Sequence, residues 1–457
     1  MIVISSMIGS GIFKKIAPMS VELGSPGLIL LCWLIPGIIT MIGAATNAEI
    51  AGLIAEPGGQ YVYFKKMYGN AFAFLYGWSC FSVIQSASIA SIAYVFAESV
   101  NAVIPLPRLP GAYEQFTLLG IFNPLQSFGV KGLTILTIIF LTSANYFGVV
   151  IGGTITNIFT ALKVLGIILI IILGFTISAG SAENLTPILE ADGFKYSSPL
   201  GLFGAMFAAM LAAFWAYDGW NNIGYLGGEV KNPKRNIPIS LFGGVALVIL
   251  VYLAINAAFL YVLPVEEIIS ITNNEHSIIA IEMMRKFLGY GGAVFISVLI
   301  MVSTFGTTNG TILASSRIYF AMAKDNLFFK SAGSHHSKYR TPHLSLIIQG
   351  AWASLLVLSG TFDQLTDMLI FASFIFYGAG AFGVFVLRKK MKDAERIYKV
   401  PGYPILPFIF VLFCVALVAV TIIENPRDSG IGLSLVLIGI PFYLFWRRKN
   451  KMLKIEP

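Results

Sequence analysis

Long apolar runs alternate with short polar gaps along the whole chain. The runs are about 20 residues long, the length that an α-helix needs to cross the hydrocarbon core of a bilayer. The pattern predicts twelve membrane spans, near residues 1–21, 27–54, 69–100, 130–149, 151–178, 200–227, 237–263, 288–321, 343–360, 363–387, 403–423 and 429–446. We therefore expect an all-α polytopic membrane protein whose 457 residues form a single transmembrane domain.

Two of the predicted spans are interrupted by glycine and polar residues, which a plain membrane helix does not need. Residues 8–12 interrupt the first span and residues 215–220 interrupt the sixth. Unwound backbone within a membrane is tolerated where it lines a cavity, because its N–H and C=O groups need partners. Paired breaks of this kind indicate a substrate site at the bilayer midplane. The alternative is that Gly9 and Gly11 only allow close helix packing.

The two breaks offer complementary groups to a zwitterion. The start of a half-helix presents free N–H groups and the positive end of the helix dipole, which attract a carboxylate. We expect the N–H groups of Ser10, Gly11 and Ile12 to play this role, with glycine leaving room for the ligand. The carbonyls that can accept hydrogen bonds from an ammonium group are those of Met7, Trp215 and Asp218. This chemistry fits the backbone end of an α-amino acid.

Composition narrows the class of protein further. Hydrophobic residues make up 57% of the chain and charged residues 11%, with a mean hydropathy of +0.81. Soluble domains carry about a quarter charged residues. Cys32, Cys80 and Cys414 all lie in apolar runs, where they are expected as small buried hydrophobes, so we expect no disulfide, metal site or cofactor. No basic leader or cleavage site follows Met1, so the first span is expected to direct insertion.

The net charge of +8 would suit a nucleic acid, but the positions of the charges favour a membrane protein. Of the 30 lysines and arginines, 21 lie in alternate gaps and eight in the others, which is the positive-inside asymmetry. We expect a protein of the plasma membrane, in contact with lipid and without a nucleic acid partner, whose termini both lie in the cytoplasm. The 21 residues lie at 65–66, 231–235, 317–340, 388–399 and 447–454, and the eight are Lys14, Lys15, Arg108, Lys131, Lys195, Arg285, Lys286 and Arg427.

Several motifs resemble those of the amino acid-polyamine-organocation superfamily, and within it the L-amino acid transporter branch, and the resemblance covers nearly the whole chain. They are Ser-Ser-Met-Ile-Gly-Ser-Gly-Ile-Phe at 5–13, Glu-Pro-Gly-Gly-Gln-Tyr at 56–61, Phe-Thr-Ala-Leu-Lys at 159–163, Trp-Ala-Tyr-Asp-Gly-Trp-Asn at 215–221 and Glu-Val-Lys-Asn-Pro-Lys-Arg-Asn-Ile-Pro at 229–238. The resemblance implies a five-plus-five inverted repeat of the LeuT type with helices 1 and 6 broken. Repeat one would cover about 1–180 and repeat two about 200–390, with helices 11 and 12 at about 403–446 and a cytoplasmic tail at 447–457.

The resemblance also implies roles for individual residues. It assigns the carboxylate site to Ser10, Gly11 and Ile12, and the ammonium site to the carbonyls of Met7, Trp215 and Asp218. Trp215 would form an aromatic lid over the substrate, although a tryptophan in a membrane helix is usually a core or lipid-facing residue. Phe371 and Ser373, just before Phe-Tyr-Gly at 376–378, look like residues of the side-chain pocket.

Lys163 lies in the middle of an apolar run, where a charged lysine costs about 2.5–3.5 kcal/mol. Its distance from both ends of the run makes escape to the interface poor, so it needs a partner. In the resembling family, the matching lysine sits near the first break, where sodium-coupled relatives hold a cation. Ser303 and Thr304 match that neighbourhood, with ordinary packing of hydroxyls against their helix as the alternative. We therefore expect transport that does not depend on sodium, commonly by exchange.

Asp218 stands where several family members have glycine, so it bears on the substrate range. It can contact a cationic substrate, or cap the half-helix that begins near Gly219. Bulky walls favour small neutral L-amino acids such as alanine and serine. Proton-coupled symport and transport of cationic amino acids stay open as alternatives.

Two further features concern partners and the start of the chain. Partnered animal members of the family link through a cysteine outside the membrane, and the gap 101–129 has none, so no disulfide-linked accessory subunit is expected.

Family members usually have a longer first half-helix, whereas about eight residues, or about 12 Å of helix, precede the break here. Either the start is trimmed or the inner gate is short.

Other classes of function fit the sequence less well. No paired acids, activated nucleophile or metal cluster stands within the spans, so we expect neither an enzyme nor catalytic residues. His335 and His336 lie in a basic gap and are interpreted as solvated loop residues. No filter repeat supports a channel. A sensor of amino acids can share the whole binding site, and uptake into liposomes would separate it from a transporter.

Overall fold

The computed structural model describes residues 2–453 except 55, 57, 119–121, 149–152, 177–179, 190–193, 223–231, 273–276 and 397. Lys231 and the start of the motif at 229–238 lie outside the described residues, as does the end of the tail at 454–457. The α-helices are α1 (Ile2–Met7), α2 (Gly11–Lys14), α3 (Ile16–Leu23), α4 (Pro26–Leu53), α5 (Gln60–Tyr68), α6 (Asn70–Ser79), α7 (Gln85–Asn101), α8 (Gly111–Glu114), α9 (Phe128–Tyr146), α10 (Gly153–Thr176), α11 (Gly201–Tyr217), α12 (Pro233–Val262), α13 (Val265–Thr272), α14 (Ile279–Lys324), α15 (His343–Ser359), α16 (Phe362–Lys390), α17 (Ile405–Glu424), α18 (Pro426–Leu437) and α19 (Gly439–Leu453).

The described part is helical, as the apolar runs predict. Within it, nine helices are long and apolar enough to cross a membrane, and two shorter apolar segments lie at Ala161–Thr176 and His343–Ser359. The first apolar run is divided into α1, α2 and α3. The expectation of a polytopic all-α membrane protein is therefore confirmed.

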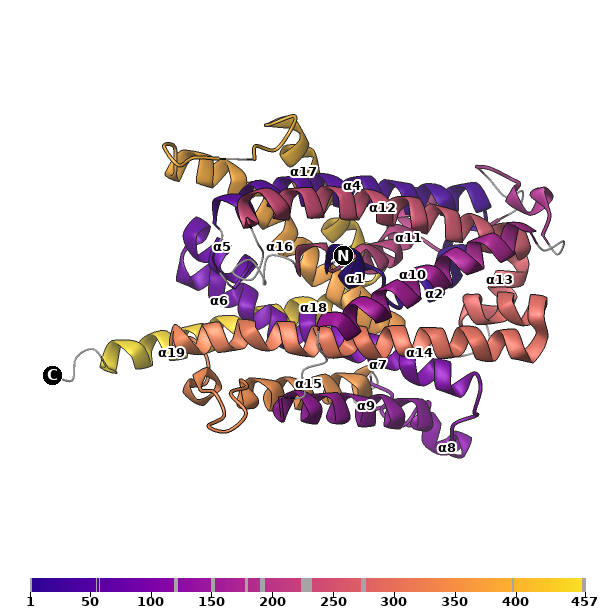
Figure 1. Ribbon diagram of the computed structural model, residues 1–457, viewed down its shortest axis with the longest axis horizontal. Coiled ribbons are helices and arrows are strands. Elements are labelled where there is room, and N and C mark those ends of the chain that lie inside the picture. Colours follow the sequence, from indigo (N-terminus) through magenta and orange to yellow (C-terminus); the bar gives the residue numbers. More distant parts are fainter. Residues whose placement is uncertain are drawn as a thin grey trace.

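Long helices pack along one another through small residues. α4 lies beside α12, α14 beside α7, and α9 beside α15 (Figure 1). A Cβ atom added at Gly37 of α4 would lie 2.7 Å from Ile249 of α12, and one added at Gly166 of α10 would lie 2.0 Å from Leu299 of α14. Such close approach is how membrane helices gain packing energy where the hydrophobic effect does not drive them together.

The two ends of the bundle differ in charge. α5 and α19 lie at one end of the long axis, which we call the α5 end, and α8 and α13 lie at the other, the α13 end (Figure 1). The α5 end carries Lys65 and Lys66, whereas α13 begins with Glu266 and Glu267. The separation of basic and acidic ends follows the pattern of the gaps in the sequence.

The lysines at the end of α2 are not gap residues. The sequence pattern counted Lys14 and Lys15 among the polar gaps, but the structure buries them, with 9% and 1% of their surfaces exposed. Each ammonium group lies within 2.6 Å of a carboxylate oxygen, which compensates the loss of water around it. Counting these two residues among the polar gaps was therefore wrong.

Candidate functional site

The two helix breaks meet in the middle of the molecule. α1 ends at Met7, and α11 ends at Tyr217 with Asp218 in an extended conformation. Gly219 has φ +93°, and a Cβ atom there would lie 2.7 Å from the carbonyl oxygen of Ser6. Glycine is needed at this position because another residue would be strained and would collide with α1. The predicted breaks are thus both present and in direct contact.

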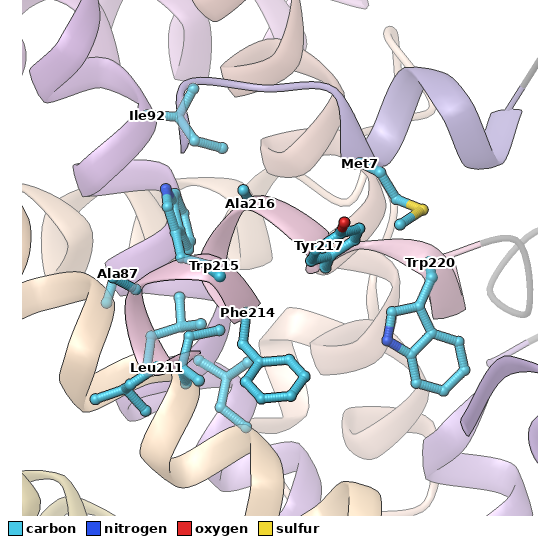
Figure 2. Close-up of a cluster of buried hydrophobic side chains, with 14 of the residues drawn as sticks. Met7, Ala87, Ile92, Leu211, Phe214, Trp215, Ala216, Tyr217 and Trp220 are labelled. Atoms are coloured by element: carbon cyan, nitrogen blue, oxygen red, sulfur yellow. The ribbon is translucent and has the colours of Figure 1, made fainter. Parts of the chain in front are cut away.

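Tyr252 of α12 joins the two breaks. Its hydroxyl lies 2.9 Å from the carbonyl oxygen of Met7 and 2.9 Å from that of Ala216. Figure 2 shows Met7 at the end of α1, near the chain of α11 at Ala216 and Tyr217. Both carbonyls belong to helix ends, where backbone oxygens have no partner within the helix. The hydroxyl therefore supplies a partner that the broken helices lack.

A cavity lies between these breaks. It holds about 440 Å³ of empty space, part of it open to solvent. The first break, the end of α11, α7 and α14 all contribute to its wall. The lining residues are Ser6, Met7, Gly9, Ser10, Gly11, Gln85, Ser88, Ile92, Trp215, Asp218, Gly219, Asn222, Thr307 and Thr311.

Five of the eight predicted substrate residues line this cavity, namely Met7, Ser10, Gly11, Trp215 and Asp218. Ile12 is buried in α2 directly beside them but does not line the cavity. Phe371 and Ser373 are buried in α16 and do not line it either; a Cβ atom at Gly432 of α18 would lie 3.4 Å from the Phe371 ring. Their role in a side-chain pocket stays a prediction.

Gly11 is required by packing. A Cβ atom there would lie 2.8 Å from both Cα and Cβ of Ala216 and 3.0 Å from Cδ1 of Trp215. The space beside Gly11 is occupied by α11, although Gly11 also lines the cavity, and its part in binding a carboxylate stays a prediction. Gly9 is different, because a Cβ atom there meets only the carbonyl oxygen of Met7, at 3.9 Å. Gly9 is the glycine that leaves space in the cavity.

Two of the three carbonyls predicted to hold an ammonium group, those of Met7 and Trp215, already have partners. The Met7 oxygen accepts from Tyr252, and the Trp215 oxygen accepts from the backbone N–H of Asp218 at 3.3 Å. A carbonyl oxygen has two lone pairs, so each retains the capacity for a second hydrogen bond.

Two buried polar atoms in the cavity wall have no hydrogen-bond partner among the described residues. They are Oγ of Ser10 and Nε1 of Trp215, on opposite breaks. Buried polar atoms in proteins are nearly always satisfied, so each unsatisfied one needs an explanation. Both atoms belong to residues that line the cavity, where a polar ligand can supply the missing partner. The ring of Trp215 also meets Phe362 edge-on, with 6.2 Å between ring centroids.

Asp218 is held by Tyr377, which the sequence analysis noted only as part of the motif at 376–378. Its Oδ1 accepts a hydrogen bond of 2.5 Å from the hydroxyl of Tyr377 in α16. The Tyr377 ring packs against Trp220, with 5.3 Å between centroids. Asp218 therefore lines the cavity and at the same time ties the end of α11 to α16.

Lys163 reaches the first break, as predicted. Its Nζ donates a 2.7 Å hydrogen bond to the carbonyl oxygen of Ile8, and only 4% of the residue is exposed. Thr304 uses its hydroxyl on its own helix, with the Ile300 oxygen at 2.7 Å, while the buried Oγ of Ser303 has no partner among the described residues. Neither residue lines the cavity. Their part in coupling stays a prediction.

Comparison with known proteins identifies the family. The family model for amino acid permeases matches residues 1–443. The chain belongs to the amino acid permease family. It is 32% identical over 451 residues to the serine/threonine exchanger SteT of Bacillus subtilis (strain 168), covering 98% of this chain and 95% of the relative. It is also 30% identical to the b(0,+)-type amino acid transporter 1 of Mus musculus, with 97% and 86% covered, and 30% identical to the large neutral amino acids transporter small subunit 2 of Homo sapiens, with 98% and 80% covered.

This permease also uses two helices in its cavity wall that the sequence analysis missed. α7 contributes Gln85, Ser88 and Ile92, and α14 contributes Thr307 and Thr311. Polar residues three or four positions apart in an apolar run were the available signal, because they share one helix face. A π-helical turn at Cys80–Ile84 precedes Gln85 and changes the direction in which α7 presents its side chains. The carbonyls of Cys80 and Ser82 in this turn accept hydrogen bonds from Tyr319 and Trp352, at 3.2 and 2.8 Å.

Proposed function

We propose that this permease exchanges small neutral L-amino acids across the plasma membrane by alternating access and without sodium. The observation that carries the proposal is a polar cavity built from both helix breaks, in a chain of the amino acid permease family. The start of α2 supplies the pole that attracts a carboxylate, and the carbonyls of Met7 and Trp215 supply acceptors for the ammonium group. The unsatisfied Ser10 Oγ and Trp215 Nε1 are additional partners for the substrate.

The wall of the cavity favours substrates with short polar side chains. Gln85, Ser88, Thr307, Thr311 and Asn222 line it with hydroxyl and amide groups that can bond a serine or threonine side chain. One oxygen of the Asp218 carboxylate accepts a hydrogen bond from Tyr377, so we assign Asp218 to holding the end of α11 and not to binding a cationic side chain. One relative is named a serine/threonine exchanger, which agrees with this size and polarity.

Independence from sodium is supported by Lys163. Its side-chain nitrogen donates to the freed carbonyl of Ile8 beside the first break. A hydrogen-bond donor held there competes with a sodium ion for the same backbone oxygen.

The architecture proposed with this function is the LeuT-type inverted repeat of twelve helices. Repeat one covers about 1–180 and repeat two about 200–390, and helices 11 and 12 at about 403–446 lie outside them. Both termini and the tail at 447–457 lie in the cytoplasm, so the α5 end is cytoplasmic. The burial of Cys32, Cys80 and Cys414 supports a protein that works without a disulfide-linked partner.

Exchange in proteoliposomes tests the proposal. Vesicles loaded with serine should take up labelled serine several-fold faster than empty vesicles, with equal rates in sodium and choline buffers. Uptake that needs a sodium gradient contradicts the coupling, and uptake driven by an imposed pH gradient into empty vesicles points to proton symport. Binding of serine without any uptake identifies a sensor.

A further inference from the structure

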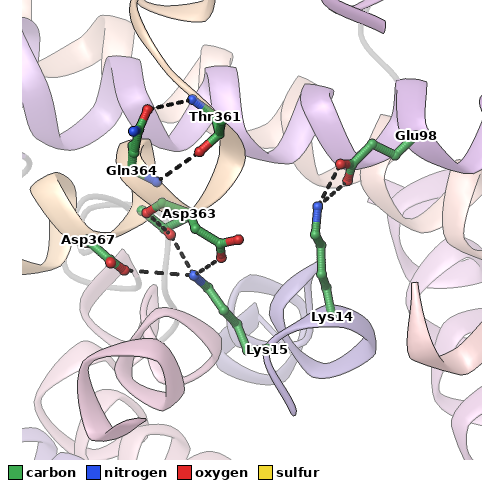
Figure 3. A network of polar contacts seen from close by, with 8 residues as sticks. Lys14, Lys15, Glu98, Thr361, Asp363, Gln364 and Asp367 are labelled. Atoms are coloured by element: carbon green, nitrogen blue, oxygen red, sulfur yellow. Dashed lines mark hydrogen bonds and ion pairs between the residues drawn. The ribbon is translucent and has the colours of Figure 1, made fainter. Parts of the chain in front are cut away.

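Two lysines hold the α13-end half of the broken first helix between two other helices. The Nζ atom of Lys14 lies 2.6 Å from both carboxylate oxygens of Glu98 in α7. The Nζ atom of Lys15 lies 2.6 Å from Asp363 Oδ1 and 2.7 Å from the Thr366 hydroxyl, and 3.8 Å from Asp367 Oδ1, all in α16 (Figure 3). The end of α2 is therefore fastened on two sides by charge-assisted contacts.

The same two lysines lie over the ring of Phe362, the first residue of α16. Their ammonium groups are 4.6 and 4.8 Å from the centroid of the Phe362 ring. Phe362 in turn meets Trp215, which lines the cavity, edge-on at 6.2 Å. The order outward from the cavity is thus Trp215, Phe362, two ammonium groups and their carboxylates. Cation–π attraction adds to the ion pairs in holding Phe362 in place.

The start of α16 is itself rigid. The Thr361 hydroxyl accepts from the Gln364 N–H at 3.4 Å, and the Gln364 side chain accepts from the Thr361 N–H at 3.0 Å, which forms a capping box (Figure 3). This arrangement fixes the first turn of the helix, where Phe362 and Asp363 stand. Movement of α2 relative to α16 therefore has to break the contacts of Lys15.

We propose that Lys14 and Lys15 form a two-sided latch that keeps the cavity closed toward the α13 end by holding Phe362 over Trp215. The inference rests on the proposed function, because alternating access requires the cavity to be closed on one side at a time. The Glu98 side chain is 2% exposed and that of Asp363 is 46% exposed. Water reaches Asp363 and can replace Lys15 there, so the Lys14–Glu98 pair is the stronger hold.

The rate at which a thiol in the cavity is alkylated tests the latch. Ser88→Cys places the thiol in the cavity wall, and the native cysteines are buried. A membrane-impermeant thiol reagent is added to proteoliposomes on the face from which Glu183→Cys is labelled. This face is the α13 end, because the neighbouring Asn184 contacts Tyr261 at the end of α12. The double variant Lys14→Gln/Glu98→Gln leaves no charge buried alone, and labelling should become about tenfold faster.

Asp363→Asn should give a smaller rise, and the reversed pair Lys14→Glu/Glu98→Lys should return the rate to near that of the parent. Lys286→Gln is the control, because its ion pair with Glu267 is of similar length, 2.8 Å, but exposed; it should change nothing. If Lys14→Gln/Glu98→Gln fails to fold, Asp363→Asn alone decides. Unchanged labelling in the folded variants, or no recovery with the reversed pair, overturns the latch. Exchange by the unaltered protein in proteoliposomes reports separately on the proposed function.

Discussion

At the scale of single residues, Gly9 and Gly11 serve different purposes although they stand two positions apart. Gly9→Val adds a side chain where a Cβ atom meets only one carbonyl oxygen, so it should fill the cavity without disturbing packing. The valine side chain takes up space that the substrate would use, so we expect the affinity for serine to fall about tenfold, which corresponds to about 1.4 kcal/mol. Gly243→Val, on an exposed face of α12 with no neighbour within 4 Å, is the matched control. Binding would be measured by scintillation proximity, and melting temperature would report on folding.

An unchanged affinity in Gly9→Val would place the substrate elsewhere. Gly11→Ala should instead destabilise the protein, because the added methyl group lies 2.8 Å from the backbone of Ala216. The sequence could not separate these two glycines, since the difference depends on where α11 crosses the first break.

Asp218 supports a second prediction. Because its carboxylate bonds Tyr377 at 2.5 Å, we expect alanine and serine to compete for uptake and arginine to compete poorly. Tyr377→Phe and Asp218→Asn should each slow exchange by loosening the end of α11, without admitting arginine. Strong competition by arginine that disappears in Asp218→Gly would show that Asp218 reads the substrate. The sequence left capping and substrate contact equally open, because Tyr377 lies 159 positions away.

At the scale of helices, Tyr252 is the contact that joins the two breaks. Tyr252→Phe removes a hydroxyl shared by the carbonyls of Met7 and Ala216, and exchange should slow about tenfold because the half-helices lose their common partner. Tyr217→Phe is the matched control, since its buried hydroxyl donates to the Trp33 carbonyl at 3.0 Å, away from the first break. Each variant should lose about 1 kcal/mol of stability, measured by chemical denaturation. Equal transport in the two variants would remove the special role of Tyr252.

Lys163 gives a prediction at the same scale. Lys163→Ala leaves the Ile8 carbonyl without this donor. We expect turnover to fall about tenfold and the affinity for serine to fall less than about threefold. Lys131→Gln is the control, because Lys131 is also buried and donates to a backbone oxygen, that of Asn123 at 2.5 Å, but this oxygen does not belong to the first break. Labelled serine exchange gives the rate and serine competition gives the affinity. A loss of affinity alone in Lys163→Ala would make it a substrate contact.

The elements of the site differ in how far sequence reveals them. The two breaks were predictable because glycine and polar residues are conspicuous in apolar runs, and Lys163 because an intramembrane charge demands a partner. Tyr252 was not, since one tyrosine among 19 looks like any other until the two helix ends are placed beside it. The π-helical turn before Gln85 has no residue signature at all.

At the scale of the whole molecule, the apolar runs predicted the positions of the helices well and their ends poorly. α14 extends from Ile279 to Lys324, although the predicted run began at 288. The first ten residues of α14 include Glu282, Arg285 and Lys286. These charged residues kept the beginning of the helix out of the predicted apolar run. Gly289, with φ +61°, marks the kink where the two parts join. Polarity thus defines where the membrane ends and says little about where the helix does.

The orientation of the bundle is the last prediction, and it follows from the charge of its two ends. Basic residues in the gaps stay in the cytoplasm because they resist translocation, so the α5 end should face inward. Ser337 and Glu183 are both exposed, and cysteines at these positions should be labelled from opposite faces by an impermeant thiol reagent. Glu183→Cys should be labelled in intact cells, and Ser337→Cys only after the cells are permeabilised. The background signal is the labelling of the same variants after the introduced cysteine has been blocked before the reagent is added. Labelling of both from outside would contradict an odd number of spans between them. Labelling of Ser337→Cys alone would invert the whole bundle, with the latch then facing the cytoplasm.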